Sequence, residues 1–390
     1  MKKIGYIMYA ALLTLGSCTS EINEEGFVDK ANSISFSAYS FKTRAYESGD
    51  IDNATALQNG NFGVVGYSGN SIYLGSESNA IAQYFSSETN HWEYVNQGQL
   101  TYWPQSGNMD FYAYFPYSAT GDVFASTNSG GMVMTINNAT GNQDVLFASA
   151  INQSYQERIP LTFNHAFSKI NSVKIKVEIN DIDVEVKKVE FINTTSSLNS
   201  QVLIDKNGKA SYGTSTGETS TCGLELGTSV TISKSENADG YSVWGSTDNK
   251  YLLATQGASE TNYVTGTSKA MWDGTTTNWA SSDKLSTKGL VCIKITGKVK
   301  THSGSIYHVG TADSDGEFYI PLKGSNHTTV GEGAATDDIQ HFFAGKRYNY
   351  TIILKDNVGY HDDGTPILKP ILFTVSKVTT WNDVNVTINL

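Results

Sequence analysis

The feature that most constrains this chain is a series of short segments in which apolar and polar residues alternate, with turn-forming residues between them. In the segment 170–179, for example, Val173, Ile175 and Val177 occupy every second position. A period of two residues is that of a β-strand with one buried face, and no long segment shows the 3.6-residue period of an amphipathic helix. The 36 glycines can supply turns between such strands. The sequence therefore predicts an all-β fold.

The candidate strands fall into two sets. About seven of them lie in the range 33–165, which is the number that one β-sandwich needs. A second set follows, and in it Asn207-Gly208 is a strong signal for a tight hairpin turn. We therefore predict two β-sandwich domains, the first over 33–165 and the second over 166–390.

The first residues have the pattern of a leader for export. Two lysines precede an apolar run over 4–15, which is shorter than the ~20 residues of a membrane-spanning helix. Residues 15–18, Leu-Gly-Ser-Cys, resemble the bacterial lipobox, after which Cys18 would become the acylated first residue. An ordinary leader with an incidental cysteine is the alternative. We predict a signal peptide over 1–17 and an acidic tether over 18–32, with the acyl chains anchored in the outer membrane.

Composition and spacing exclude several classes of function. The net charge of −11 disfavours nucleic acid as a partner, because phosphate binding needs a basic patch. The histidines have no metal-binding or catalytic spacing, so we expect no enzyme activity, no metal and no cofactor. Cys222 and Cys292 are compatible with a disulfide in an oxidising compartment or with two buried thiols.

Several motifs, in a fixed order over nearly the whole chain, resemble the fimbrillin family, the subunits of type V pili. They are the lipobox leader, 41–45 (FKTRA), 102–104 (YWP), 111–116 (FYAYFP), 144–148 (DVLFA), 161–170 (LTFNHAFSKI) and a late Trp381. The resemblance implies two tandem transthyretin-like β-sandwich domains after a lipoprotein signal peptide. It also implies a structural subunit of a fimbrium, which contributes to cell adhesion at the surface of a Gram-negative bacterium.

The resemblance further implies assembly by exchange of β-strands between subunits. In such pilins an Arg-specific protease removes the lipidated segment with the first strand, and a strand of the next subunit fills the groove. On this sequence the cut would fall between Arg44 and Ala45. The exchanged strand would carry Ile34, Phe36 and Ala38 on its apolar face. The candidate donor segment is 371–390, and its alternating apolar residues are Ile371, Phe373, Val375, Val384, Val386 and Ile388.

The scarcity of arginine is a second reason to expect the protease to cut after Arg44. The chain has only two others, Arg158 and Arg347, and both adjoin apolar strands, whereas Arg44 precedes a polar, acidic stretch. A solvated charge at the end of a strand is the alternative for Arg44. The expected partners are other fimbrial subunits, identical or related, the processing protease and the outer membrane. Stalk, anchor and tip subunits are all compatible with the sequence.

A different class of function competes with the fimbrial one. Surface lipoproteins of all-β fold can bind glycans without polymerising, and some of the six tryptophans and 22 tyrosines could stack on sugars. Most aromatic residues are expected to fill sandwich cores instead.

Overall fold

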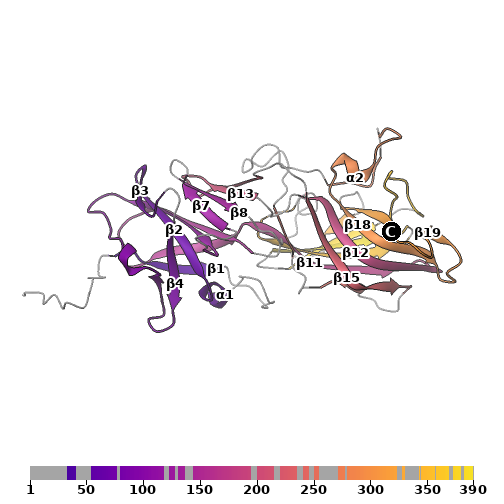
Figure 1. Ribbon diagram of the computed structural model, residues 1–390, viewed down its shortest axis with the longest axis horizontal. Coiled ribbons are helices and arrows are strands. Elements are labelled where there is room, and N and C mark those ends of the chain that lie inside the picture. Colours follow the sequence, from indigo (N-terminus) through magenta and orange to yellow (C-terminus); the bar gives the residue numbers. More distant parts are fainter. Residues whose placement is uncertain are drawn as a thin grey trace, which may run out of the picture.

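The structure is a computed structural model that describes most of the chain from residue 33 onward. The described ranges are 33–40, 54–76, 80–117, 123–127, 131–136, 144–194, 200–214, 220–234, 240–245, 250–253, 271–276, 279–322, 327–329, 342, 344–355, 357–368, 372–378 and 382–389. Figure 1 shows an elongated molecule with the N-terminal strands at one end and the C-terminal strands at the other. The regular secondary structure of the described residues is almost entirely β-strand, which confirms the all-β prediction.

The α-helices are short. They are α1 (Ala54–Gln58) and α2 (Leu285–Lys288), and η2 (Gln97–Gln99) is a single 3₁₀ turn. None of the helices in the described ranges has the length and apolar character needed to cross a bilayer.

The N-terminal half is built on an eight-stranded sheet that closes on itself. In spatial order its strands are β1 (Phe36–Ser40), β10 (Ile159–His165), β9 (Leu146–Gln153), β6 (Met109–Phe115), β2 (Asn61–Ser68), β4 (Ile81–Ser86) and β5 (His91–Tyr94), and β3 (Ser71–Leu74) pairs with β2. The two ends of this order meet, because the Tyr94 hydroxyl of β5 donates a hydrogen bond of 2.9 Å to the carbonyl of Ile34, just before β1. The sheet therefore surrounds an apolar core, which we call the inner core.

A four-stranded sheet covers the other face of the eight-stranded sheet. Its order is β14 (Ala210–Thr214), β13 (Ser200–Ile204), β8 (Met132–Ile136) and β7 (Val123–Thr127). Successive residues of a strand point to opposite faces, and both faces of β2 are used: Val64 lies in the inner core, whereas Val65 packs with Met134 between the two sheets.

The hairpin β13–β14 confirms the turn predicted at Asn207-Gly208. Gly208 has a φ of +77°, and the Asp205 carboxylate accepts hydrogen bonds from the backbone N–H groups of Asn207 and Lys209. The sequence placed this hairpin in the second domain, yet β13 pairs with β8 of the N-terminal half. The hairpin thus ties the two halves together across the predicted boundary at 165.

The C-terminal half is a sandwich of two sheets. The first has the order β16 (Tyr241–Trp244), β11 (Phe167–Val177), β22 (Lys346–Leu354), β24 (Asn382–Asn389), β23 (Leu372–Val378) and β21 (His327–Thr329), and β17 (Lys250–Leu253) pairs with β11. The second has the order β15 (Ser220–Ile232), β12 (Ile182–Thr194), β18 (Cys292–Thr301) and β19 (Tyr307–Val309), and β20 (Gly316–Pro321) pairs with β18. Alternating apolar residues from both sheets, such as Ile175 and Val184, form one core between them.

The two cysteines of this half lie on opposite sides of β12. Cys222 on β15 is the register partner of Phe191, and Cys292 on β18 is the partner of Ile192. Two strand spacings of ~4.8 Å separate the cysteines, which exceeds the ~7 Å that a disulfide can span between Cα atoms. Both side chains are buried and no disulfide joins them. Burial raises the pKa of Cys292, so its reactive thiolate form is disfavoured.

Gly297 offers a test of the packing between β12 and β18. The register of this pair shifts between Val186 and Lys188, and a Cβ atom added at Gly297 would lie 1.8 Å from the carbonyl oxygen of Glu185. We expect Gly297→Ala to lower the free energy of unfolding by about 1–3 kcal/mol, measured by urea denaturation. The control is Gly227→Ala, since Gly227 has no atom within 4 Å of the added Cβ and should change stability by less than about 0.5 kcal/mol. Equal effects would contradict this account.

Candidate functional site

The strand that the sequence singled out lies at one end of the eight-stranded sheet. Five residues of β1, Phe36–Ser40, pair in parallel with Ile159–Phe163 of β10. Among the described strands, β10 is the only one that pairs with β1. The inward-facing side chains of Ile34, Phe36 and Ala38 are 0%, 1% and 8% exposed. The inward side chains of the strand are therefore deeply buried, whereas its backbone is paired along one edge only.

Phe36 anchors β1 to the opposite wall of the inner core. Its ring makes edge-to-face contacts with Phe62 on β2, at 6.0 Å between centroids, and with Phe111 on β6, at 5.5 Å. Such aromatic pairs contribute beyond the area that they bury. Removal of β1 would uncover these two rings and the edge of β10.

The chain that leads into β1 is fixed by separate hydrogen bonds. The Ile34 N–H donates to the carbonyl of Thr101 at 2.8 Å, and the Tyr94 hydroxyl donates to the Ile34 carbonyl at 2.9 Å. Burial raises the pKa of Tyr94 well above its usual range, so the hydroxyl keeps the proton that it donates. No pattern in the sequence indicates this role, because Tyr94 resembles any other aromatic residue of an alternating strand.

The second edge of β1 faces two cavities, which together we call the seam between β1 and β5. One cavity, of about 440 Å³, is lined by residues 33–35, and the other, of about 240 Å³, by residues 36–38; Trp92 of β5 lines both. Arg158 Nη2 lies 2.7 Å from His91 Nε2, and both residues line the two cavities. His91 Nδ1 lies 2.6 Å from the Asn90 carbonyl and so donates to it, which leaves Nε2 to accept from Arg158.

The residues proposed for processing lie outside the described residues. They are Cys18, Arg44 and Ala45, and the described part of β1 ends at Ser40. The two other arginines are described. The Arg158 side chain is 38% exposed and contacts His91 and Glu157, and Arg347 on β22 is 9% exposed.

The candidate donor segment lies in the C-terminal sheet of its own chain. β24 runs parallel to β22 over eight residue pairs and antiparallel to β23 over seven. Val386 and Ile388 of β24 are buried in the core of the C-terminal sandwich. Phe373, Val375 and Val384 lie on β23 and β24, but their side chains are outside the description, as is Ile371. The two described donor side chains, Val386 and Ile388, therefore lie away from β1, since they belong to a different core from its inward residues.

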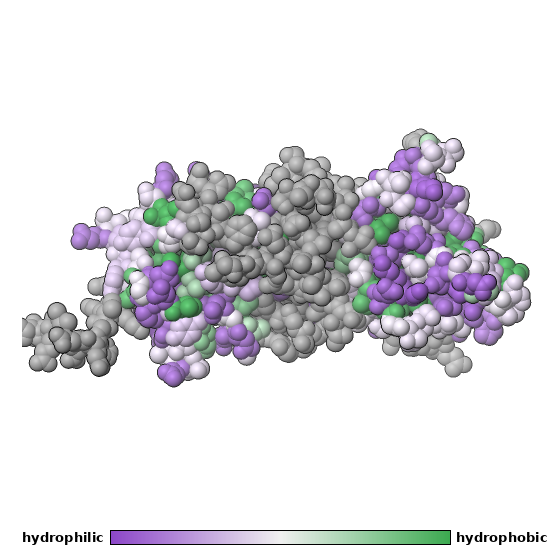
Figure 2. Space-filling model, in the orientation of Figure 1, coloured by the Kyte–Doolittle hydropathy of each residue, from purple (hydrophilic) through white to green (hydrophobic). Residues whose placement is uncertain are grey.

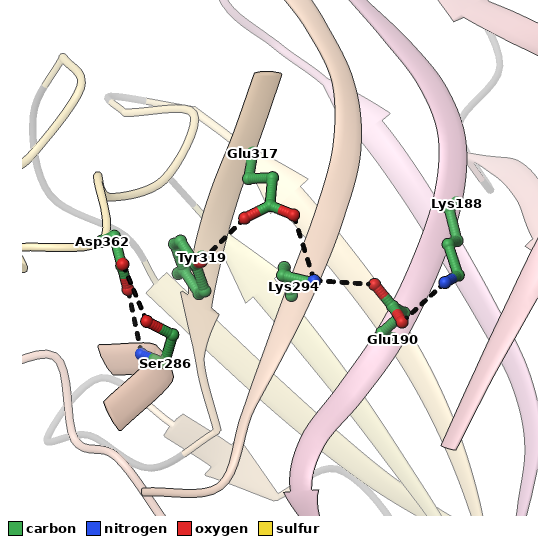
Figure 3. Close-up of polar contacts among 7 residues, drawn as sticks. All are labelled: Lys188, Glu190, Ser286, Lys294, Glu317, Tyr319 and Asp362. Carbon is green, nitrogen blue, oxygen red and sulfur yellow. Dashed lines mark hydrogen bonds and ion pairs between the residues drawn. The ribbon is translucent and has the colours of Figure 1, made fainter. Parts of the chain in front are cut away.

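Figure 3 shows the polar side chains on the outer side of the second C-terminal sheet. Lys294 of β18 lies 3.0 Å from Glu190 of β12 and 3.1 Å from Glu317 of β20, and Lys188 lies 2.8 Å from Glu190. Burial opposes the ionisation of Glu190, but the hydrogen bonds from Lys188 and Lys294 outweigh it and lower the pKa of Glu190. Lys294 thus joins three strands, and the ionised Glu190 carboxylate cannot serve as a general acid near neutral pH.

The side chain of Asp362 has a structural contact, and the acidic, histidine and cysteine side chains form no metal-binding group in the described ranges. The Asp362 carboxylate accepts hydrogen bonds from the N–H and the hydroxyl of Ser286, at 2.9 and 2.8 Å, and so fixes the start of α2 (Figure 3). Within the described ranges, no group of three or more His, Cys, Asp or Glu side chains is placed to hold a metal ion.

The tryptophans bear on the glycan-binding alternative. Trp92, Trp244 and Trp272 are 5%, 1% and 1% exposed, and Trp103 and Trp279 pack against cores as partly buried residues. The side chain of Trp381 lies outside the description. On the face shown in Figure 2, the described apolar residues form small patches among polar ones. The five described tryptophans therefore fill cores, as the aromatic residues of a sandwich should.

Comparisons with known proteins found a matching family and similar solved structures. Residues 43–284 match a family model described as fimbrillin-like. A fimbrial protein from Bacteroides vulgatus has a similar structure, with 13% identity, a TM-score of 0.45 and coverage of 92% of this chain and 98% of that chain. A fimbrilin from Porphyromonas gingivalis is 10% identical, with a TM-score of 0.43 and coverage of 92% and 96%. None of the curated proteins compared with the sequence matches it.

The contribution of Phe36 can be measured by truncation. We expect Phe36→Ala to lower the free energy of unfolding by about 3–5 kcal/mol, because it removes two ring contacts and leaves a cavity in the inner core. Urea denaturation gives the size of the effect, and hydrogen exchange of residues 36–40 should become faster. Ser37→Ala is the matched control on the other face of the same strand, with an expected change below about 0.5 kcal/mol. A Phe36→Ala protein as stable as this control would contradict the anchoring role.

The ion pairs of Glu190 predict a specific dependence on pH. Because the pKa of Glu190 is lower in the folded chain than in the unfolded chain, its ionisation stabilises the fold above the unfolded pKa, and this stability is lost as pH falls through the folded pKa. We expect Glu190→Gln to cost roughly 1 kcal/mol near neutral pH, and the difference from the unmodified protein to vanish in acid. Thermal unfolding across the acidic range measures it. Glu157→Gln, at a side chain that is 89% exposed, should show no such trend, and a constant Glu190→Gln difference would refute the interpretation.

Proposed function

Because the chain belongs to the fimbrillin-like family, we propose that it is a fimbrial subunit, exported as a lipoprotein and polymerised when proteolysis removes β1 and a neighbouring subunit supplies a replacement strand. Family membership supports a pilin-like role in adhesion at the cell surface. The proposal adds acylation at Cys18, an outer-membrane anchor and an Arg-specific protease that cuts after Arg44. The role is structural rather than catalytic, and the partners are other subunits of the fimbrium.

The observation that carries the proposal is the way in which β1 is held. Its three inward side chains fill the inner core, yet its backbone pairs with a single strand. A strand of this kind can leave without breaking the pairing of the seven strands that remain. Its departure would expose apolar surface and the edge of β10, and both are features that capture an added strand.

Covalent attachment explains why a cut would be needed. As long as β1 belongs to the same chain, its effective concentration at its seat is far above that of any strand from another molecule. Cleavage after Arg44 would turn β1 into a separate peptide that can dissociate. A donor strand then competes on equal terms, and residues 371–390 are the candidate donor. Donation would require this segment to leave its own sheet, where β24 lies between β22 and β23.

The glycan-binding alternative has lost part of its support. It relied on tryptophans and tyrosines at the surface, and the five tryptophans that the structure describes pack into cores, whereas tyrosines such as Tyr155 and Tyr241 are exposed. The family match and the pairing of β1 along one edge favour the fimbrial proposal.

Processing at Arg44 can be tested directly on the purified precursor. Limited digestion with an Arg-specific protease should give a new N-terminus at Ala45, and Arg44→Ala should abolish both this product and the growth of surface filaments. Arg158→Ala is the control, because that side chain contacts His91 at the seam and its loss should leave the cut at Arg44 unchanged. Cleavage only at other sites, or normal filaments from the Arg44→Ala protein, would refute the proteolytic trigger.

A further inference from the structure

Gln83 is a polar residue in an apolar environment. It lies in β4, its side chain is 0% exposed, and within the described part of the chain neither the oxygen nor the nitrogen of its amide meets a hydrogen-bond partner. Such groups are rare in folded proteins, because burial removes the hydrogen bonds to water without replacing them. Packing alone does not explain why a glutamine, rather than an apolar residue, occupies this position.

The position of Gln83 connects it to the seat of β1. Its register partners are Phe62 on β2 and Tyr94 on β5, and both belong to the inner core. Residues directly opposite one another on neighbouring antiparallel strands share one face of the sheet. Phe62 contacts the ring of Phe36, and Tyr94 donates a hydrogen bond to Ile34. Gln83 thus lies between the two residues that touch the exchanged strand from this wall.

The exchanged strand has no inward side chain that could form a hydrogen bond with the amide of Gln83. Its inward side chains are Ile34, Phe36 and Ala38, all of them apolar, and its serines at 35 and 37 alternate with them and so point the other way. While β1 is in place, its inward side chains supply no hydrogen-bond partner for the buried amide of Gln83. An unsatisfied amide makes this arrangement less stable than one in which a polar group faces it.

We propose that Gln83 determines the specificity of the groove, by forming hydrogen bonds with a hydroxyl or carboxamide side chain on the strand that replaces β1. The inference rests on the proposed strand exchange and says which strands the groove accepts. A strand with only apolar inward residues leaves the amide unsatisfied, whereas a strand with one polar inward residue satisfies it. The exchange is thereby favoured in one direction, away from β1.

The candidate donor segment contains side chains of the required kind. In the alternation of the sequence, Thr379 follows in phase with Phe373 and Val375, and Thr380 and Asn382 precede in phase with Val384, so these three would point inward with the apolar residues. A binding site built around a buried hydrogen-bonding group discriminates strongly against a ligand that lacks the partner group. A second copy of this chain therefore has the chemistry that Gln83 would recognise.

The test is a double-mutant cycle on the cleaved protein. A synthetic peptide of residues 371–390 is titrated into protein cut after Arg44, from which the β1 segment has been removed. Three peptide variants, Thr379→Val, Thr380→Val and Asn382→Leu, are then compared with it. We expect one of them to bind about tenfold more weakly to the unmodified groove and equally well to a Gln83→Met groove.

The stability of the precursor supplies the control. Gln83→Met should raise the melting temperature, because an apolar side chain of similar size removes the unsatisfied amide. Gln153→Met should lower it, since the amide of Gln153 donates to the Ile151 carbonyl and accepts from Gln156, both at 2.7 Å. Gln83→Leu serves as the second variant if Gln83→Met does not fold.

The possible outcomes distinguish the specificity role of Gln83 from strand exchange itself. If the unmodified peptide binds but no variant depends on Gln83, the specificity role is refuted and strand exchange stands. If the unmodified peptide does not bind to the cleaved protein, strand exchange with this donor fails, and the role of Gln83 fails with it. A lower melting temperature of both Gln83 variants would show that the amide is satisfied in the precursor and would also overturn the inference.

Discussion

The N-terminal half of the molecule depends on the unequal attachment of β1. The strand has backbone pairing on one edge only, whereas its side chains reach across the inner core to rings on β2 and β6. Burial of apolar surface, more than the short parallel ladder, therefore keeps it in place. Contacts of this type cost little association entropy while the strand belongs to the same chain, but the full cost returns once the strand is a separate molecule. The same set of contacts can thus be stable in one covalent state and exchangeable in another.

The two ends of the described chain contrast in how they are bound. β1 has one neighbouring strand, and its second edge faces the cavities of the seam. β24 lies within a sheet, between a parallel and an antiparallel neighbour, and its residues Val386 and Ile388 are part of the sandwich core. The outer side of the facing sheet is joined by the ion pairs of Lys294. The first strand is consequently easier to remove than the last.

Local sequence patterns were enough to predict the all-β class, many of the strands and the buried face of β1, but not a long strand such as β15. The alternation of Ile34, Phe36 and Ala38 was visible in the sequence, and so was the hairpin turn at Asn207-Gly208. What the patterns could not predict are contacts between residues far apart in the chain. The parallel pairing of β1 with β10, and of β13 with β8, is of this kind.

The seat of β1 illustrates the same limit at the level of single residues. Nothing around Gln83 in the sequence shows that its amide is buried, since a glutamine in an alternating strand is expected to face water. The hydrogen bond from Tyr94 to the Ile34 carbonyl depends on the closure of the sheet, which joins residues 60 positions apart. Motifs pointed to Arg44 and Cys18 through the resemblance to a family, and those positions lie outside the described residues.

The order of parts along the chain has a consequence for the timing of assembly. Under the proposed processing, an acylated Cys18 comes first, then β1, then the cut after Arg44, so the lipid anchor and β1 would leave on one peptide. When that peptide dissociates, the subunit would lose its hold on the bilayer and gain an open acceptor groove together. No subunit would diffuse away from the membrane while still sealed, and none would be open while still tethered. Release and readiness to join would thereby be synchronised without any additional regulator.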